Sequence, residues 1–425
     1  MATHYRSARD HLARLFAGKT AEELAARLRP DLETPYRPLG AGGKITGARV
    51  AARWTETGRA DLAPPLLDEA TRAGMEGFER NIENFAGTVK VPVGLAGPLR
   101  VRGTAAQGDY IVPLATTEAA LVASYHRGAR VISEAGGCVA ITLDSGIGRA
   151  PGFVFASAVE AATFCVWALG RVEALRSIAE ATTAHGRLSD LRVTMEGNHV
   201  YLHFTFTTGD AAGQNMVTLA VESVCRELVE SAPVRPVRSY IEANLSGDKK
   251  ASAQSFLGVR GRKVTAEVVL GPDLLRRRLH VTAEQMADYW RISAMGGVLS
   301  GTLGVQGHFA NGLAALSIAT GNDAACVAES AVGTTRFEVR PGGALYATVT
   351  LPNLVLGTVG GGTGLPSQKA CLELMGLAGA GKAQALAEVA AGLALAGELS
   401  IIAALASGEF ARAHRRRARG KRTHA

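Results

Sequence analysis

Three polar segments of the sequence carry side chains that could exchange protons with a substrate. Glu118 follows two threonines, Lys249 lies in an Asp-Lys-Lys triplet, and Asp323 follows a glycine that ends a predicted helix. A positioned lysine ammonium can stabilise negative charge on a carbonyl oxygen, and neighbouring carboxylates can raise one another's proton affinity. Taken singly, however, Glu118 and Asp323 are typical of carboxylates at a helix N-terminus, and most such lysines are solvated.

Two glycine-containing segments could hold a nucleotide. In TTGDAAGQNMV, a predicted strand ends and Gly209, Asp210 and Gly213 open a helix, whose N–H groups and dipole favour a pyrophosphate. The consecutive glycines 360–362 precede a helix that starts at Pro366, and they permit close approach of a phosphate or a planar ring. The second segment lacks a GK[ST] ending, which argues against a P-loop NTPase.

Length and composition indicate a globular protein of a reducing compartment. The chain has 425 residues, of which 47% are hydrophobic, so two or three domains are expected. Its five cysteines form no CxxC pair, which argues against a disulfide framework or a metal site. The most apolar run, from Val389, is interrupted by Glu398, and no secretion signal is recognised. We therefore expect a cytoplasmic protein without a membrane span.

The positive charge is concentrated near the C-terminus. Much of the net charge of +8 lies in the run HRRRARGKR, which starts at His414. Such a run is usually a solvated tail, and a lone histidine there is usually inert. Nucleic-acid binding is not expected, because neither interleaved aromatic residues nor a nucleic-acid motif accompanies the run. Attraction of a polyanionic small molecule is a third interpretation.

The elements that must position these groups suggest an α+β fold. A helix is predicted over 117–134, with Glu118 in its first turn, after strand-like runs from residue 83 onwards. The middle of the chain predicts a strand near 152–158, a helix over 161–181, paired strands at 191–197 and 199–208, and a helix over 210–230. This order is typical of a small split βαβ domain inserted in a larger, helix-rich domain.

The predicted domain division follows from the joints around this insertion. Residues 1–75 form an N-terminal helical region, 76–150 and 244–425 form the large domain, and 151–243 form the small domain.

In combination and in this order, the motifs resemble the hydroxymethylglutaryl-CoA reductase family. The resemblance spans about residues 80 to 415 and is carried by ENFAGTVKVPVGLAGPL, ATTEAALVAS, TTGDAAGQNMV, DKK and GTVGGGTGLPSQKACL. Within the family, the chain is similar to the class I-like branch, which includes eukaryotic and archaeal enzymes. It resembles a soluble prokaryotic form of that branch. The resemblance implies a large substrate (CoA)-binding domain, an inserted ferredoxin-like nucleotide-binding domain, and a homodimer with active sites at its interface; a tetramer is the alternative.

The resemblance also implies an activity. This is a two-step reduction of (S)-3-hydroxy-3-methylglutaryl-CoA to mevalonate by NADPH, with release of CoA; NADH is the alternative cofactor. Glu118, Lys249 and Asp323 would be the acid and base groups, and His414 would protonate the leaving thiolate. The cofactor-binding positions would be Asp210, Ala212, Gly213, Gln214, Asn215, Gly360, Gly361 and Gly362. The substrate-binding positions would be Glu83, Ser124, Arg149, Lys250 and Asn311, with Arg149 at the CoA phosphates.

Several positions depart from the family pattern without removing these groups. The substitutions are Ala119 for Gly, Ala212 and Gln214 for Met, His126 for Asn, and Ala251, Ser255, Phe256, Cys326 and Val327 at further motif positions. Because these residues line the site, a reductase of a different acyl-CoA stays open as an alternative. A non-catalytic CoA-binding homologue is the other alternative, which the presence of all four proposed catalytic side chains disfavours.

Overall fold

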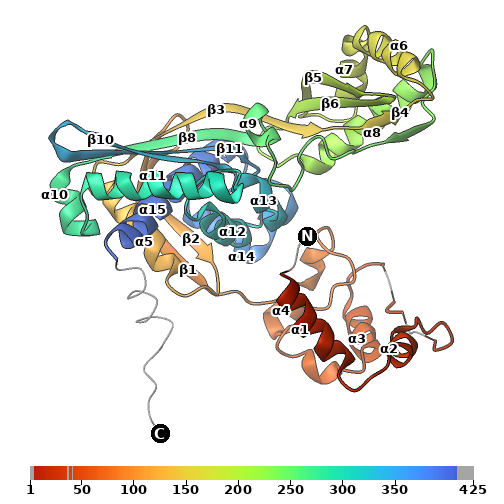
Figure 1. Ribbon diagram of the computed structural model, residues 1–425, viewed down its shortest axis with the longest axis horizontal. Helices are drawn as coiled ribbons and strands as arrows, with labels where there is room; N and C mark the ends of the chain where they lie inside the picture. Colours follow the sequence, from red (N-terminus) through yellow and green to blue (C-terminus); the bar gives the residue numbers. More distant parts are fainter. Residues whose placement is uncertain (1–3, 36–37, 41, 409–425) are drawn as a thin grey trace. The chain divides into compact units, whose positions relative to one another are not determined.

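The computed structural model describes residues 4–35, 38–40 and 42–408. The chain divides into two compact units, Met1–Thr88 and Val89–Ala425 (Figure 1). The first unit extends beyond the predicted boundary at residue 75. The reason is that Phe85 packs in its core, where Trp54 and Arg53 donate hydrogen bonds to the carbonyls of Ala86 (2.8 Å) and Phe85 (2.7 Å).

The first unit is helical, as predicted, and has a small core of its own. Its buried residues are Ile45, Val50, Ala63, Leu67 and Phe85. Its helices are α1 (Tyr5–Phe16), α2 (Ala21–Leu28), α3 (Gly47–Glu56), η1 (Ala60–Leu62), α4 (Glu69–Ala73) and η2 (Met75–Phe78).

The second unit is built on a large mixed sheet. Its strands are β1 (Val93–Gly103), β2 (Gln107–Ala115), β3 (Cys138–Arg149), β8 (Gly261–Leu270), β9 (Gly304–Val305), β10 (Gly333–Arg340) and β11 (Ala344–Leu354). They lie in the order β2-β1-β3-β8-β11-β10-β9, with β1–β3 and β9–β10 parallel and the other pairs antiparallel. The sheet is larger than the helix-rich prediction implied, although Val264, Ala266 and Val268 already alternate with polar residues, as half-buried strands do.

Helices pack on this sheet around one central helix. The helices are α5 (Leu121–Glu134), α9 (Gln254–Leu257), α10 (Pro272–Leu274), η3 (Leu275–Leu279), α11 (Ala283–Ser300), α12 (Phe309–Thr320), η4 (Ala324–Cys326), α13 (Val327–Ser330), η5 (Pro341–Gly343), η6 (Gly361–Gly364), α14 (Pro366–Leu374) and α15 (Ala383–Ala406). Helix α15 contacts α5, α11, α12 and strands β1, β3, β8 and β11. It is therefore the centre of the main hydrophobic core.

Helix α15 is the one described helix that is long and apolar enough to cross a membrane, yet 83% of its most apolar 18-residue window is buried inside the protein. Its two buried glutamates are satisfied internally. Glu388 accepts the N–H groups of Ala105 and Ala106, both at 2.8 Å, and Glu398 accepts those of Gly307 (2.7 Å) and His308 (2.9 Å). These features are those of a core helix.

The small sheet has the split βαβ topology that the sequence predicted. Its strands β4 (Gly152–Val154), β5 (Arg187–Glu196), β6 (His199–Thr207) and β7 (Arg238–Tyr240) lie in the antiparallel order β7-β4-β6-β5. Helices α6 (Ala158–Leu169), α7 (Val172–Glu180) and α8 (Gln214–Ser231) accompany it. The single helix predicted over 161–181 is two helices, because α6 ends at Gly170.

Strand β3 belongs to both sheets. Its first part pairs with β1 and β8, and its last residues, Ile147 to Arg149, pair with β6 (Figure 1). One continuous strand thus joins the two sheets, and the predicted site residue Arg149 is its last residue.

The close approach of α5 and α15 leads to a prediction about stability. A Cβ atom at Gly128 would lie 1.9 Å from the carbonyl oxygen of Ala396, so Gly128→Ala forces the two helices apart. We expect a loss of about 1–3 kcal/mol in the free energy of unfolding. Gly296→Ala in α11 is the control, since nothing lies within 4 Å of its Cβ position and alanine favours a helix by about 0.5–1 kcal/mol. Urea unfolding of both variants measures the difference, and equal stabilities would contradict the packing argument.

Candidate active site

Lys249 and Asp323 form an ion pair between two loops. The lysine Nζ lies 2.7 Å from Oδ2 of Asp323, and each side chain is less than half exposed (41% and 43%). Asp323 follows the C-cap of α12, where Gly321 has a φ of 71°, and its carboxylate caps η4 by accepting the N–H of Ala325 at 2.9 Å. The predicted helix stop and N-cap are therefore both present. One carboxylate serves both the cap and the lysine.

Each partner of this pair favours the charged form of the other. The hydrogen bond and the negative charge of Asp323 raise the pKa of Lys249, against the opposing effect of partial burial. Partial burial disfavours the Asp323 carboxylate, but the hydrogen bonds from Lys249 and Ala325 outweigh it and lower the pKa of Asp323. The pair is therefore charged across neutral pH. It is lost as the pH falls through the lowered pKa of Asp323 or rises through the raised pKa of Lys249.

Close backbone contacts bring the glycine segments to the same place. A Cβ atom at Gly321 would lie 2.2 Å from the carbonyl oxygen of Gly362, so the loop 360–362 is directly against the turn that precedes Asp323. Asn322 holds the start of this glycine segment, at Gly357. Its Oδ1 accepts the N–H of Gly357 at 2.7 Å, and its Nδ2 donates to the Gly357 carbonyl at 3.2 Å. Sequence analysis missed Asn322, because an Asn after a helix-ending Gly is an ordinary turn residue.

The turn before α8 lies on the other side of the same loop. A Cβ atom at Gly357 would lie 2.7 Å from the backbone nitrogen of Ala212, and the N–H of Thr358 donates to the Asp210 carbonyl at 2.9 Å. Gly213 is the N-cap of α8 with a φ of 79° and provides no side-chain cap. The backbone N–H groups of the first turn of α8 are therefore not capped by a side chain, which suits a pyrophosphate.

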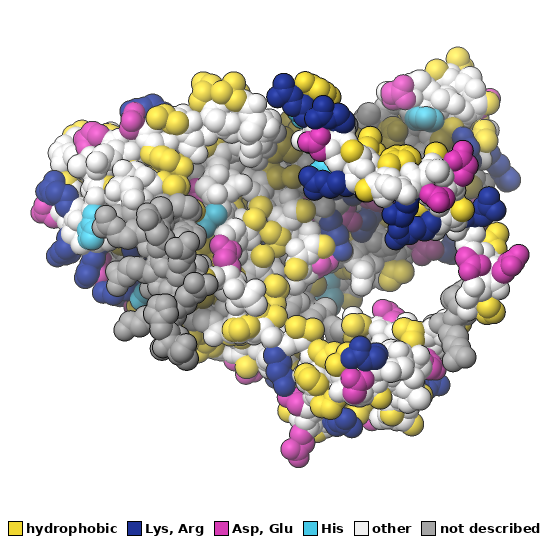
Figure 2. Space-filling view, turned by 60° about the horizontal axis from the view of Figure 1, so that its bottom comes forward, with side chains coloured by type: hydrophobic (Ala, Val, Ile, Leu, Met, Phe, Trp, Pro, Cys, Tyr) yellow, Lys and Arg dark blue, Asp and Glu magenta, His cyan; other side chains and the backbone are white. Residues whose placement is uncertain are grey.

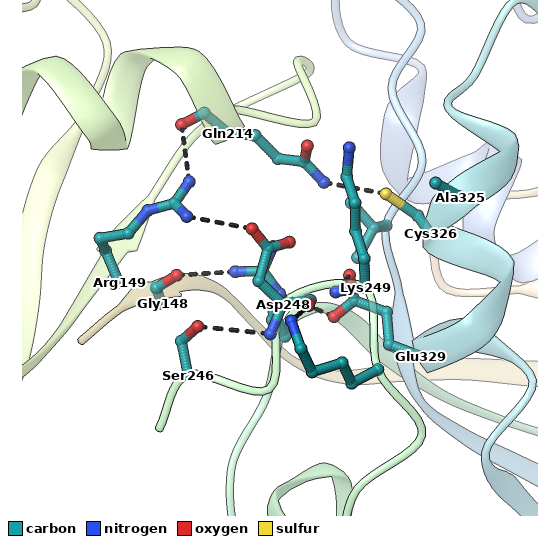
Figure 3. Close-up of polar contacts among 12 residues, drawn as sticks. Gly148, Arg149, Gln214, Ser246, Asp248, Lys249, Ala325, Cys326 and Glu329 are labelled. Atoms are coloured by element: carbon teal, nitrogen blue, oxygen red, sulfur yellow. Dashed lines mark hydrogen bonds and ion pairs between the residues drawn. The ribbon is translucent and has the colours of Figure 1, made fainter. Parts of the chain in front are cut away.

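Some side chains around this turn contact other parts of the protein, and others are exposed. The amide of Gln214 donates to the sulfur of Cys326 at 2.9 Å (Figure 3), and Asn215 is exposed. The Asp210 carboxylate accepts the N–H groups of Gly381 (2.7 Å) and Ala383 (3.1 Å) at the start of α15. Burial opposes ionisation there, yet these N–H groups outweigh it and lower the pKa of Asp210. Asp210 thus holds the turn before α8 against the start of α15.

Arg149 is buried, and its guanidinium is engaged within the protein. It lies 3.0 Å from Asp248 (Figure 3). It also lies 3.5 Å from Glu242 and donates to the hydroxyl of Thr218 at 2.8 Å. Thr218 lies on α8 and Asp248 directly precedes Lys249, so Arg149 connects helix α8 to the loop that carries Lys249. The contact of Arg149 with CoA phosphates stays a prediction. Glu242 and Thr218 were not predicted from the sequence.

A second buried arginine completes an ion-pair chain under Lys249. Arg260 donates its Nε to Glu329 at 2.6 Å and a guanidinium N–H to the carbonyl of Gly148 at 2.6 Å, and it forms an ion pair with Asp248. Oε1 of Glu329 accepts the backbone N–H of Lys249 at 3.1 Å. Burial raises the pKa of Glu329, and the charge of Arg260 opposes this shift. Neither Arg260 nor Glu329 was singled out from the sequence, since a lone Arg or Glu carries no local signal of burial.

Glu118 belongs to a separate cluster. Nδ2 of Asn311 donates to both carboxylate oxygens of Glu118, each at 3.1 Å. The prediction that Glu118 lies in the first turn of a helix is wrong, because α5 begins only at Leu121, after Ala120 takes a left-handed φ of 73°. Nearby, the Ser124 hydroxyl donates to Ser400 at 2.9 Å.

The two clusters lie toward opposite ends of α12. Asn311 is near its start and Asp323 follows its end, so roughly 14 Å of helix separates Asn311 from Thr320 at about 1.5 Å per residue. Within the described residues, none of the contacts joins Glu118 to Lys249 or Asp323. The three predicted acid and base groups therefore do not all meet in the structure of one chain.

The remaining predicted residues lie as follows. Lys250 is exposed and donates to the Asp248 carbonyl at 2.9 Å. Glu83 lies in the first unit and is exposed. His414 lies outside the described residues. In the described ranges no group of three or more His, Cys, Asp and Glu residues could hold a metal ion, and all five cysteines are free thiols.

A helix start without a side-chain cap suits a bound anion, and an ammonium–carboxylate pair suits acid–base chemistry. Comparison with known proteins gives the family of the chain. Residues 59–419 match the family described as hydroxymethylglutaryl-coenzyme A reductase. The 3-hydroxy-3-methylglutaryl-coenzyme A reductase of Aeropyrum pernix is 42% identical over 375 residues, which cover 87% of this chain and 87% of that protein. The reductase of Pyrococcus horikoshii is 43% identical over 345 residues, 79% of this chain and 83% of that protein. The chain belongs to the hydroxymethylglutaryl-coenzyme A reductase family.

A solved structure shares the fold. The class II 3-hydroxy-3-methylglutaryl-CoA reductase of Streptococcus pneumoniae, bound to NADPH in open conformations, matches with a TM-score of 0.62. The match covers 85% of this chain and 97% of that one at 21% sequence identity. At this identity the likeness concerns the fold, and it agrees with the predicted mixed α and β architecture.

The ion pair leads to a prediction about the lysine pKa. In Asp323→Asn the negative charge is lost, so the pKa of Lys249 should fall toward its ordinary value. The pH dependence of labelling of Lys249 by an amine-reactive reagent, resolved by peptide mass spectrometry, measures this shift, because only the neutral amine reacts. Asp288→Asn, which removes the exposed partner of Arg291, is the control. A Lys249 labelling curve that is the same in both variants would contradict the assignment.

Proposed function

We propose that this chain catalyses the two-step reduction of (S)-3-hydroxy-3-methylglutaryl-CoA to mevalonate, with two NADPH oxidised and CoA released. The observation that carries the proposal is the Lys249–Asp323 ion pair, beside the uncapped start of α8. When bound, each NADPH would supply one hydride to the carbonyl carbon. Overall, two hydrides and two protons would break the C–S bond and leave a primary alcohol and the CoA thiol.

Lys249 has the chemistry that each hydride step requires. Hydride addition places negative charge on the carbonyl oxygen, and an ammonium held in place before the reaction stabilises that charge without reorganisation. Asp323 keeps Lys249 protonated through the raised lysine pKa and fixes the direction of its side chain. Lys249 therefore acts as the oxyanion-stabilising group and Asp323 orients it.

The dinucleotide fits the turn before α8. Backbone N–H groups at Gly213 and the following residues suit a pyrophosphate. Gly360 and Gly361 have no atom within 4 Å of a Cβ position, which leaves room for a planar ring to approach the backbone. NADPH is the proposed cofactor and NADH the alternative. The comparison of initial rates with the two dinucleotides decides between them.

A second subunit is part of the proposal. Glu118 lies at the opposite end of α12 from Asp323, so a homodimer that brings Glu118 of one subunit toward Lys249 of the other completes the acid–base set. Helix α11 exposes Ile292, Met295, Val298 and Leu299, more apolar surface than a helix facing only water usually shows. On the face that Figure 2 presents, hydrophobic side chains also lie among the charged ones. A tetramer is the alternative assembly.

Further assignments rest on the motif positions. His414 would protonate the departing CoA thiolate, a downhill transfer for an imidazolium. A class I-like assignment is supported by 42% identity to the archaeal relative and 36% identity to a rice reductase, compared with 21% to the class II enzyme. We propose a cytoplasmic location, in keeping with free thiols and the burial of α15.

A related acyl-CoA is the second candidate substrate. Gln214 and Cys326, which contact each other, occupy motif positions that depart from the family pattern, and the charges of Asp323 and Lys249 act on Cys326. Assays with a series of acyl-CoA thioesters compare the two candidates. Dinucleotide oxidation with another thioester, and none with the hydroxymethylglutaryl ester, would favour the second.

The central prediction concerns Lys249→Met. This substitution removes the ammonium and keeps much of the side-chain volume, so the rate of NADPH oxidation with the hydroxymethylglutaryl thioester should fall by about a thousandfold. Binding of the dinucleotide, followed by its fluorescence, should be largely retained. Lys19→Met, at an exposed position of the first unit, is the matched control and should be unaffected. Unchanged turnover in Lys249→Met would refute the assigned role, and a wild-type protein that binds NADPH without oxidising it would favour a non-catalytic homologue.

A further inference from the structure

Glu329 accepts a hydrogen bond from the backbone of Lys249. It lies in the short helix α13 and is fully buried, with a relative exposure of 0%. Its two carboxylate oxygens have different partners. Oε1 accepts the Lys249 N–H at 3.1 Å, whereas Oε2 accepts the Nε–H of Arg260 at 2.6 Å (Figure 3).

Arg260 connects Glu329 to the residue before the lysine. It is 3% exposed, donates to the Gly148 carbonyl at 2.6 Å, and forms an ion pair with the Asp248 carboxylate. The Asp248 side chain and the Lys249 N–H are thereby fixed to the same buried arginine–glutamate pair. The loop has little freedom at this point, although Lys249 is half exposed.

Lys249 needs such support because of its backbone. Its φ of 55° is in the left-handed region, which a side chain with a Cβ atom disfavours. The direction of its Cα–Cβ bond, and therefore the reach of its ammonium toward Asp323, depends on this conformation. A relaxed loop would turn the side chain away from its partner.

We propose that Glu329 and Arg260 are positioning residues that hold Lys249 in its left-handed conformation and so set its ion pair with Asp323. Among the described contacts, neither residue touches the Lys249 ammonium, so both act through the backbone. The catalytic consequence rests on the proposed function, whereas the conformational consequence does not.

Two substitutions at one position separate the acceptor from the charge. Glu329→Gln keeps an oxygen that can accept the Lys249 N–H, and Glu329→Met removes it at similar volume. Glu388→Met is the matched control, because Glu388 is another fully buried carboxylate that accepts two backbone N–H groups, on the distant helix α15.

Amide hydrogen exchange tests the conformational part without any turnover. Exchange of the Lys249 N–H should be at least tenfold faster in Glu329→Met than in the wild type, and intermediate in Glu329→Gln. Glu388→Met should leave this amide unchanged. Wild-type exchange of the Lys249 amide in folded Glu329→Met would overturn the proposal.

Turnover and its pH profile test the catalytic part. Because a misplacement of about 1 Å can cost on the order of a hundredfold in rate, kcat should fall by about ten- to a hundredfold in Glu329→Met with little change in KM. Loosening the ion pair lets the pKa of Lys249 fall and that of Asp323 rise. The alkaline limb of the profile should therefore move to lower pH and the acidic limb to higher pH. A fall in kcat with both limbs unmoved indicates a merely structural role and counts against the proposal.

Arg260→Lys provides a second route if Glu329→Met does not fold. Lysine keeps the charge but lacks the planar fork that reaches Glu329, Asp248 and Gly148 together. We expect the same faster exchange of the Lys249 amide and the same narrower pH profile of turnover. Wild-type exchange and a wild-type profile in Arg260→Lys would overturn the proposal. If the wild type itself does not reduce the thioester, the proposed function fails while the amide-exchange result still decides the conformational part.

Discussion

The proposed chemistry depends on the 2.7 Å contact between Lys249 and Asp323, and that contact depends on how closely three turns approach one another. At Gly321 and Gly357 the neighbouring backbone lies where a Cβ atom would be, so a larger residue at either position would separate the turns. Since both side chains of the ion pair remain about two-fifths exposed (41% and 43%), solvent weakens their attraction, and the loops set the geometry of the pair. The glycines therefore matter to the site as much as the charged groups.

Carboxylates, of which three are fully buried and Asp210 is partly exposed, connect distant segments of this protein. Glu388 and Glu398 of α15 bind backbone N–H groups of two separate loops, Asp210 binds those at the start of α15, and Glu329 binds that of Lys249. An N–H group satisfied by an ionised or hydrogen-bonded carboxylate is fixed in direction as well as in distance. Such contacts cost desolvation free energy, so they are better suited to specifying loop positions than to adding stability.

The arrangement of the two sheets explains why cofactor and acyl chemistry can meet. Strand β3 runs from the large sheet into the small one, and Arg149, at its end, links α8 with the Asp248 carboxylate. The turn before α8, where we propose that the dinucleotide binds, is thus connected to the loop of Lys249 through one strand and one guanidinium. Helix α12, in contrast, keeps two predicted site residues of one chain apart, because its length separates Glu118 from Asp323. This is the physical reason for proposing that two subunits complete the site.

The sequence by itself determined the local features: the helix stop at Gly321, the cap at Asp323, the glycine turn before α8 and the alternation that gives the small split βαβ sheet. Each depends on neighbours a few residues apart, which a sequence pattern records. Only the tertiary structure decided that Asn322 holds loop 357–362, that Arg149 is internally paired, and that Arg260 and Glu329 lie beneath Lys249. Those contacts join residues 35 to 99 positions apart, and burial and partner choice at such separations leave no signal in the local sequence.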